Sequence, residues 1–352
     1  EQVAAIWKSL YSKYRIHIDY AHRTFRWDSE ASLKAHVHCV IIAFSVAPQK
    51  GKKILFTTQR VQEVENINAY LMDAPDVFIE SRKHPLCNVP EIRKGNQPTD
   101  GGHLIIEATE IDEFLSKEPL ARPYIKRLIG AKEYINRKPR YCLWLVNTPP
   151  SELRKMPLVM DRIRQVREMR LQSPDAGTRR LADVPTVFRE TNNPKRFIVV
   201  PSVSSERRKY VPIGFLDGDT IATNLVLIIP DAPLYLFGIL TSNVHMAWMR
   251  AVCGRLKSDY RYSKDVVYNN FPWPTPTEEQ KGKIERTAQA ILDARDLYPD
   301  CSLADLYDET TMPPELRKAH QENDKAVMRA YGFDIKTTTE TSCVAELMRR
   351  YQ

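Results

Sequence analysis

The segment at residues 257–274, with the sequence KSDYRYSKDVVYNNFPWP, constrains this chain more than any other. Its first half combines three cations with hydroxyl groups, which are the groups that bind a nucleic-acid backbone. In its second half, Pro272 and Pro274 have a fixed φ and push the residues before them into an extended conformation. Phe271 and Trp273 are therefore predicted to be held on a rigid structural wedge. The alternative is that the segment only closes a hydrophobic core, since aromatic side chains are most often packing residues.

Positive charge is concentrated in the middle of the chain. The 352 residues, 43% of them hydrophobic, are enough for two or three globular domains and carry a formal net charge of +8. Residues 151–215 contain 14 Lys or Arg and 7 Asp or Glu, a net charge of +7, whereas residues 281–352 contain 11 against 13, a net charge of −2. A basic patch attracts polyanions by neutralising phosphates and releasing counterions, but a run of charge is also typical of an ordinary solvated surface. Charge alone leaves both interpretations open.

The sequence argues against a metal site and against a membrane segment. The six cysteines are far apart and never form a Cys-x-x-Cys pair, and the closest histidines, His36 and His38, have no third ligand nearby. The longest apolar runs, such as residues 225–229, are too short to cross a bilayer, and no signal-peptide pattern is present. We therefore expect reduced thiols, no metal, no membrane contact and a cytoplasmic location.

Four blocks of the sequence resemble one protein family. They are residues 21–27 (AHRTFRW), 98–104 (PTDGGHL), 204–210 (SSERRKY) and 255–274, which begins RLKSDYRYS and ends YNNFPWP. In this order, and over nearly the whole chain, they resemble MmeI-type restriction-modification enzymes. Those are large single chains that combine a nuclease, an adenine methyltransferase and a target recognition domain. The resemblance implies that this chain is the C-terminal part of such an enzyme.

The resemblance also implies a mixed α/β fold in several parts. Residues 1–50 would be the terminal helix and last two strands of a Rossmann-like methyltransferase sheet, and residues 51–90 a linker. Residues 91–276 would be the mixed α/β target recognition domain, and residues 277–352 a C-terminal helical bundle. The spacing of apolar residues predicts a helix over residues 2–14 and a pair of antiparallel strands over residues 15–25 and 35–44, of which residues 37–44 are buried. Because the helix begins abruptly at residue 1, we expect that the chain was cut there.

The methyltransferase motifs of the family are missing from this sequence. No Gly-rich turn for S-adenosylmethionine is present, and the nearest match to an Asn-Pro-Pro-aromatic loop, residues 147–151, reads NTPPS. We therefore expect no cofactor in this part, with S-adenosylmethionine bound by the parent enzyme. The family implies that an aromatic ring between the last two strands stacks on the extruded adenine. That residue would be Phe25, with Trp27 as the competitor; the alternative is that both rings pack against the rest of the methyltransferase domain.

Other patterns predict the remaining elements. They are short helices over residues 64–71, 107–117 and 124–128, strands over 141–146 and 197–200, a surface helix rich in arginine over 156–171, a hairpin around the Asp217-Gly218-Asp219 turn, and one buried helix over 235–252 that ends near Arg255. Residues 95–102 predict a turn-rich loop, in which Asp100-Gly101-Gly102 permits positive φ. A capping box at residues 277–280 and a helix over residues 314–331, closed by Gly332, predict a helical C-terminal unit.

The candidate DNA-binding residues lie in the central part of the chain. They are Arg179, Arg180, Asn192, Asn193, Ser204, Ser205, Glu206, Arg207, Arg208, Arg255, Lys257, Ser258 and Arg261. Arg, Asn and Glu carry the groups that read guanine, adenine and cytosine, so we assign residues 206–208 to base edges, with Asn192 and Asn193 as weaker candidates. Arg255, Lys257 and Arg261 stand beside hydroxyl residues and are assigned to phosphates. For Glu206, the alternative is an ion pair with a neighbouring arginine.

These inferences predict sequence-specific recognition of double-stranded DNA. The chain would act as the C-terminal part of an S-adenosylmethionine-dependent, adenine-specific DNA methyltransferase of a restriction-modification system, preceded by a methyltransferase domain and, where the parent also cleaves, a nuclease domain. Alone it is expected to be inactive. Two other classes stay open: a non-catalytic DNA-binding specificity module, and an RNA-binding protein that stacks single-stranded bases on aromatic rings.

Overall fold

The computed structural model describes residues 2–28, 36–48, 51–57 and 60–352. Within these ranges the strands form four small sheets, and helices pack around them. The predicted mixed α/β class is confirmed. No helix in the described ranges is both long enough and apolar enough to cross a membrane.

The N-terminal sheet has the strand order β2-β1-β3-β4. It consists of β1 (His17–Asp28), β2 (His36–Ser45), β3 (Lys53–Phe56) and β4 (Val61–Val64), with helix α1 (Gln2–Tyr14) packed on it. β1 pairs with β2 antiparallel and with β3 parallel, so the predicted helix and strand pair are confirmed. A small core that includes Ile18, Leu55 and Ile67 lies in this unit, and Trp7 of α1 packs against it.

The prediction that residues 37–44 are buried is wrong for residues 38–44; the side chain of Val37 lies outside the described residues. Val40, Ile41 and Phe44 are 47%, 49% and 51% exposed. In the described part of the chain β2 is an edge strand, paired with β1 only. A continuous apolar run predicts burial when other elements cover both faces of the strand, and the described elements do not cover these side chains.

Residues 64–71 do not form the predicted helix. After β4, the buried side chain of Asn68 accepts hydrogen bonds from the backbone N–H groups of Tyr70 (3.0 Å) and Met72 (3.3 Å). Such bonds between a side chain and the backbone replace helical ones, and Leu71 has a positive φ of 55°, at which a helix cannot continue. Ile67, Asn68 and Val77 are buried, so the part of the predicted linker that follows β4 is a compact, irregular segment.

Two further four-stranded sheets occupy the middle of the chain, with the orders β12-β7-β8-β6 and β11-β9-β13-β5. Their strands are β5 (Arg93–Lys94), β6 (Ile105–Glu107), β7 (Ile125–Ile129), β8 (Arg140–Leu143), β9 (Arg196–Pro201), β11 (Gly214–Asp217), β12 (Thr220–Ala222) and β13 (Val226–Pro230). Short helical pieces connect them: α2 (Ile111–Lys117), η1 (Pro119–Tyr124), α3 (Ala131–Ile135), α4 (Pro150–Leu153), α6 (Ala176–Arg180) and η2 (Leu181–Asp183). The strands predicted near residues 141–146 and 197–200 are confirmed, and Gly101 and Gly102 have the predicted positive φ.

Three local predictions in this region need correction. The helix predicted over residues 107–117 begins only at Ile111. Residues 125–129 form strand β7 because they pair with β8 on one side and β12 on the other. The Asp217-Gly218-Asp219 turn does not close a hairpin, since β11 before it pairs with β9 and β12 after it pairs with β7 in the other sheet. A turn signal predicts a reversal of the chain, but it does not choose the partner of each strand.

Helix α5 (Pro157–Leu171) is confirmed, but Arg170 does not lie on its surface. This side chain is fully buried, and its guanidinium donates hydrogen bonds to the carbonyls of Thr99, Leu181, Val184 and Val187 at 2.7–3.0 Å. A buried charge needs such partners, and the five donors of arginine match a ring of backbone acceptors. Arg170 therefore connects the loop that contains Thr99 to the segment that follows α6.

The buried helix predicted over residues 235–252 is two helices, α7 (Leu234–Leu240) and α8 (Asn243–Val252). Ser242 begins the second one, because its Oγ accepts from the backbone N–H of His245 (3.3 Å) as an N-cap. His245 and Met246 are fully buried, as predicted. Strand β14 (Gly254–Leu256) follows α8, so Arg255 lies on a strand and not at a helix end.

Phe271 and Trp273 belong to the hydrophobic core. After η3 (Lys264–Tyr268), a single π-helical turn, the Phe271 ring is fully buried, 4.6 Å from His245 and 5.2 Å from Trp273. The hydroxyl of Tyr331 donates to the carbonyl of Pro272 (2.8 Å). The prediction of a wedge is wrong, because the two prolines hold these rings inside the core; for residues 271–274 the alternative of a core-closing segment is correct.

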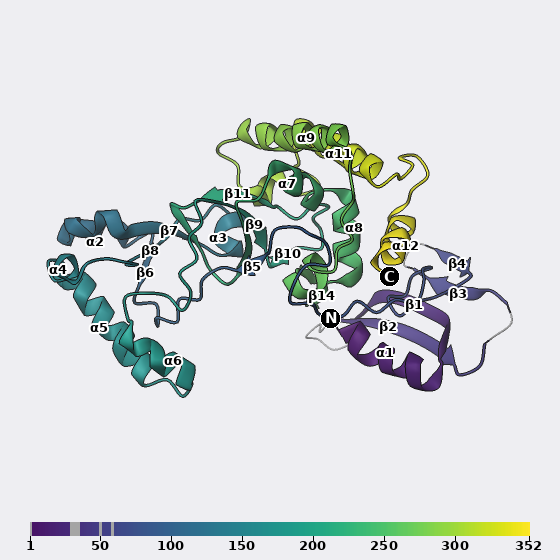
Figure 1. Ribbon diagram of the computed structural model, residues 1–352, viewed down its shortest axis with the longest axis horizontal. Helices are drawn as coiled ribbons and strands as arrows, with labels where there is room; N and C mark the ends of the chain where they lie inside the picture. The colour runs from purple at the N-terminus through teal and green to yellow at the C-terminus, as the bar shows by residue number, and fades with distance from the viewer. Residues whose placement is uncertain (1, 29–35, 49–50, 58–59) are drawn as a thin grey trace.

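The C-terminal helices are α9 (Glu278–Asp296), α10 (Leu303–Leu306), α11 (Pro314–Ala330) and α12 (Glu340–Tyr351). The predicted capping box is confirmed: Thr277 Oγ1 accepts from the Gln280 N–H (3.2 Å), and Gln280 Oε1 accepts from the Thr277 N–H (2.9 Å). Gly332 follows α11 with φ +74°. Buried residues of α7, α8, α9, α11 and α12 form one hydrophobic cluster, so these helices share a core with the central region. Figure 1 shows α9 and α11 next to α7, and α12 beside the N-terminal sheet.

Because two of its histidines are fully buried, we expect the folded protein to lose stability in acid. Burial lowers the pKa of His245 to about 3 and that of His320 well below its usual value. Below pH 6.5 only the unfolded chain protonates these imidazoles, so the folded state loses stability as the pH falls. Asp324 opposes this, because burial raises its pKa to about 6 and its contribution therefore grows as the pH falls through 6.

The destabilising contribution of the two histidines in acid is larger than the stabilising contribution of Asp324. The free energy of unfolding in urea should therefore be about 2–3 kcal/mol lower at pH 5 than at pH 7.5. His245→Gln should remove about half of the histidine contribution. An equal free energy at both pH values would contradict this account.

Candidate nucleic-acid interface

A three-stranded ribbon brings most of the candidate DNA-binding residues together. Its strand order is β10-β15-β14, with β10 (Val203–Ser204), β15 (Asp259–Arg261) and β14. Val203 pairs with Arg261, and Arg255 pairs with Tyr260. Residues 204–208 and 255–261, which are about 50 residues apart in the sequence, are therefore neighbours on one ribbon. In Figure 1 this ribbon lies between the lobe that carries α5 and α6 and the N-terminal sheet.

The turn between β14 and β15 presents Lys257 to solvent. Lys257 and Ser258 form the two-residue connection, and Lys257 has a positive φ of 56°, a conformation that glycine adopts more readily. Arg255 has a structural role beside this turn, because its guanidinium lies 3.9 Å from the centre of the Tyr260 ring and donates to the carbonyl of Ser258 (2.8 Å). The Nη1 atom of Arg255 is also 3.8 Å from Glu206 Oε2. Arg255 is therefore an ion-pair partner for Glu206 within the ribbon, as the alternative for Glu206 requires.

Residues 204–208 form a compact turn after β10. Ser204 is buried, while the backbone N–H of Arg207 donates to Ser205 Oγ (3.3 Å) and that of Arg208 to the Ser205 carbonyl (3.1 Å). The side chains of Glu206 and Arg207 are exposed, whereas Arg208 is partly buried. Burial lowers the pKa of the Arg208 guanidinium, and the carboxylates of Asp259 and Asp308 act in the opposite direction. Arg207 is therefore the arginine of this turn that is best placed to meet a partner.

The other candidates lie away from the ribbon. Arg179 and Arg180 are exposed on α6, where the Arg179 guanidinium donates to the carbonyls of Ser173 and Pro174. The backbone of Asn192 pairs with the side chain of Asn96 (2.6 and 2.8 Å). These contacts place the two groups at separate parts of the central region, and their DNA-binding role stays a prediction.

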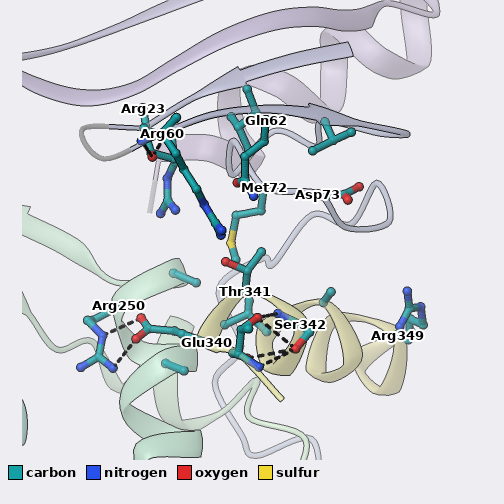
Figure 2. A pocket seen from close by; sticks show the side chains of 18 of the residues that line it. Arg23, Arg60, Gln62, Met72, Asp73, Arg250, Glu340, Thr341, Ser342 and Arg349 are labelled. Atoms are coloured by element: carbon teal, nitrogen blue, oxygen red, sulfur yellow. Dashed lines mark hydrogen bonds and ion pairs between the residues drawn. The ribbon is translucent and has the colours of Figure 1, made fainter. Parts of the chain in front are cut away.

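A cavity of 880 Å³ adjoins the ribbon and contains arginines that the sequence did not single out. Its lining includes Arg23 of β1, Arg60 before β4, Arg250 of α8, Arg255 of β14 and Arg349 of α12. Figure 2 shows Arg23 and Arg60 pointing from the N-terminal sheet toward the ion pair of Arg250 and Glu340, whose atoms are 2.8–2.9 Å apart. These arginines come from four separate stretches of the chain, since only Arg250 and Arg255 are close in sequence, so no local sequence pattern could have grouped them.

The positions of Phe25 and Trp27 do not decide between them. β1 has an irregularity in its pairing with β2 between His22 and Phe25, and such bulges are frequent next to active sites. The Phe25 ring is half-buried, 4.8 Å from His22, while Trp27 is 62% exposed. Stacking of either ring on an extruded adenine stays a prediction.

The described ranges contain no group of three His, Cys, Asp or Glu side chains arranged to hold a metal ion. The sequence has no Gly-rich turn for S-adenosylmethionine, and the arginine-lined cavity has the chemistry of a site for anions.

Comparison with known proteins identifies the family. Residues 73–275 match the family model "MmeI, target recognition domain", residues 276–352 match "MmeI, C-terminal domain", and residues 1–57 match "MmeI, DNA-methyltransferase domain". The chain belongs to the MmeI family. The predicted division into domains at residues 50, 90 and 276 stays a prediction.

Two MmeI-family relatives are longer than this chain. It is 42% identical over 332 residues to DNA methyltransferase A of Bacillus subtilis (strain 168), an alignment that covers 94% of this chain and 38% of that protein. It is also similar to a solved structure of the Type IIL restriction-modification enzyme MmeI in complex with DNA, with a TM-score of 0.91 and 44% identity over 100% of this chain and 47% of that one. The chain thus spans less than half the length of both relatives.

The geometry of the turn predicts opposite effects of two substitutions on stability. Lys257→Gly relieves a left-handed backbone position, so the free energy of unfolding should stay the same or rise by up to about 1 kcal/mol. Arg255→Ala removes the contact with Tyr260 and the hydrogen bond to Ser258, so we expect a loss of about 1 kcal/mol. Urea unfolding measures both; a larger loss for Lys257→Gly would show that the turn is wrongly described.

Proposed function

We propose that this chain is the DNA-reading part of an S-adenosylmethionine-dependent, adenine-specific DNA methyltransferase of a restriction-modification system. The observation that carries the proposal is the ribbon with its exposed cations, next to an arginine-lined cavity, in a chain that belongs to the MmeI family. The solved MmeI relative is a complex with DNA, and the curated relative is a DNA methyltransferase. A cytoplasmic location fits this activity.

In this proposal the ribbon has two tasks. Lys257 and Arg261 are exposed and neutralise phosphates of the duplex, which positions the protein without reading sequence. Arg207 and Glu206, exposed on the turn after β10, meet base edges in the groove. The arginines of the cavity extend the positive surface toward the N-terminal sheet. Asn192 and Asn193 remain weaker candidates for base contacts.

Methyl transfer needs residues that this sequence lacks. S-adenosylmethionine supplies the methyl group in the parent enzyme, and the family's cofactor turn and Asn-Pro-Pro-aromatic loop are both absent here. The sequence of the complete parent gene would distinguish the proposed methyltransferase from the alternative, a non-catalytic DNA-binding specificity module. A Gly-rich cofactor motif and an Asn-Pro-Pro-aromatic motif upstream support the methyltransferase, whereas their absence from the complete gene supports the module.

The chain should bind double-stranded DNA with an affinity that falls steeply with salt. Neutralising about five phosphates gives a slope of about −4 to −5 for the logarithm of the affinity against the logarithm of the salt concentration. Fluorescence anisotropy with a labelled duplex measures this slope, and single-stranded RNA of the same length serves as competitor. Preference for the RNA would favour the RNA-binding alternative. An affinity that does not depend on salt would contradict both the proposed DNA binding and the RNA-binding alternative.

Two substitutions should separate phosphate contacts from base contacts. Lys257→Gly should weaken binding to every duplex and reduce the salt slope by about 1, whereas Arg207→Ala should cost roughly 1–3 kcal/mol at one base pair only. The measurement is selection from a randomised duplex library, followed by affinities for single-base variants at two salt concentrations. If Lys257→Gly changes the preference at one base while Arg207→Ala weakens all duplexes equally, the two roles are reversed.

The isolated chain should not methylate DNA. With labelled S-adenosylmethionine and duplex DNA we expect no incorporation above a protein-free control, because the cofactor and catalytic motifs are missing from the sequence. Incorporation above that control would show that a methyl-transfer site exists within these residues.

A further inference from the structure

The C-terminal helices hold the turn that we assign to base reading. Residues 205–209 connect β10 to Tyr210, which is buried. The Tyr210 hydroxyl donates to Asp324 Oδ2 of α11 (2.6 Å), and the Tyr210 ring stacks on His320 of the same helix with the ring centres 4.1 Å apart. One end of the turn is therefore attached to α11 by both a hydrogen bond and a ring contact.

The attachment to α11 is itself supported by other elements. Asp324 Oδ1 accepts from the backbone N–H of Asn243 (2.8 Å), at the start of α8. His320 Nε2 lies 2.7 Å from the hydroxyl of Tyr307, which also accepts from Arg295 Nε of α9 (2.9 Å). The contacts of Asp324 with α8 and of His320 with Tyr307 restrict the orientation of these buried side chains, because breaking a buried hydrogen bond is costly.

A second attachment runs through α12. Arg250 Nη1 donates to the carbonyl of Lys209 (3.1 Å), while Arg250 Nε and Nη2 donate to the two carboxylate oxygens of Glu340 (2.8 and 2.9 Å). Arg250 thus connects the backbone of the turn to the first residue of α12. A guanidinium held by a bidentate carboxylate has a fixed direction, so Glu340 determines where this donor points.

We propose that Asp324 and Glu340 are positioning residues for base recognition: they hold residues 205–209 in the orientation in which Arg207 meets its base, although neither side chain contacts DNA. This inference rests on the proposed function. It assigns the C-terminal helices a part in sequence specificity, in addition to their part in the common core. Small displacements matter here, because a bidentate contact with a base depends on both distance and direction.

The test compares the base preferences of three conservative variants, each of which loses one hydroxyl group or one charge. Tyr210→Phe removes the hydrogen bond to Asp324, and Glu340→Gln removes the charge that orients Arg250. Tyr331→Phe is the matched control, since its buried hydroxyl also donates one hydrogen bond, in this case to the carbonyl of Pro272 (2.8 Å), a residue outside the turn. Each variant and Arg207→Ala undergo selection from the same randomised duplex library, with thermal unfolding as a check of the fold.

We expect Tyr210→Phe and Glu340→Gln to lose roughly two- to tenfold of their discrimination at the base pair that Arg207→Ala affects. Tyr210→Phe, which keeps the net charge, should also keep the wild-type affinity and salt slope on non-specific duplex. Tyr331→Phe should keep the wild-type preference. The inference is overturned if both folded variants keep the wild-type preference, if the control loses it equally, or if Arg207→Ala affects no base pair. A wild-type chain that enriches no sequence at all would instead contradict the proposed function.

Discussion

The burial of Trp248 on α8 is the contact on which the core shared by the central region and the C-terminal helices depends. The ring is fully buried, its Nε1 donates to the carbonyl of Val267 (3.0 Å), and it packs near Phe271 and Tyr351. Removal of a buried ring of this size costs about 3–5 kcal/mol in typical cores. Strand β14 begins at Gly254, two residues after α8 ends, so the packing of Trp248 also sets the place at which the ribbon leaves the core.

Arginine has two opposite roles in this chain. Arg170 is buried and donates to a ring of backbone carbonyls, so its charge serves the fold. Arg207 is exposed on a turn and stays available to a partner. Arg250 combines the two roles, because it connects the carbonyl of Lys209 to Glu340 and also lines the cavity. The count of basic residues in a segment therefore overestimates the charge that a polyanion meets.

The shared core explains how a helical C-terminal unit can affect a recognition surface elsewhere. α9, α11 and α12 bury their apolar faces against α7 and α8 and not only against each other. A change in these helices is therefore transmitted to the elements that carry the ribbon, since close-packed interiors relax little around a displaced side chain. The hydrogen bond between Tyr210 and Asp324 adds a directional contact to this packing.

Local sequence patterns were sufficient for elements whose cause is local. The helix over residues 2–14, the capping box at Thr277 and the turn after α11 follow from the spacing of apolar residues, from side chains that bond their own helix end, and from a glycine at positive φ. The residues of the ribbon were also named from the sequence, because cations beside hydroxyl groups are recognisable as a pattern. Four blocks of residues were enough to identify the family.

Only the tertiary structure decided which segments meet. It paired β11 and β12 with different sheets, left β2 exposed, placed Phe271 in the core, and brought Arg23 and Arg60 to the same cavity as Arg250. Strand pairing and burial depend on partners far away in the sequence, and a single segment carries no record of those partners. For the same reason the attachment of residues 205–210 to α11 and α12 became visible only in the folded chain.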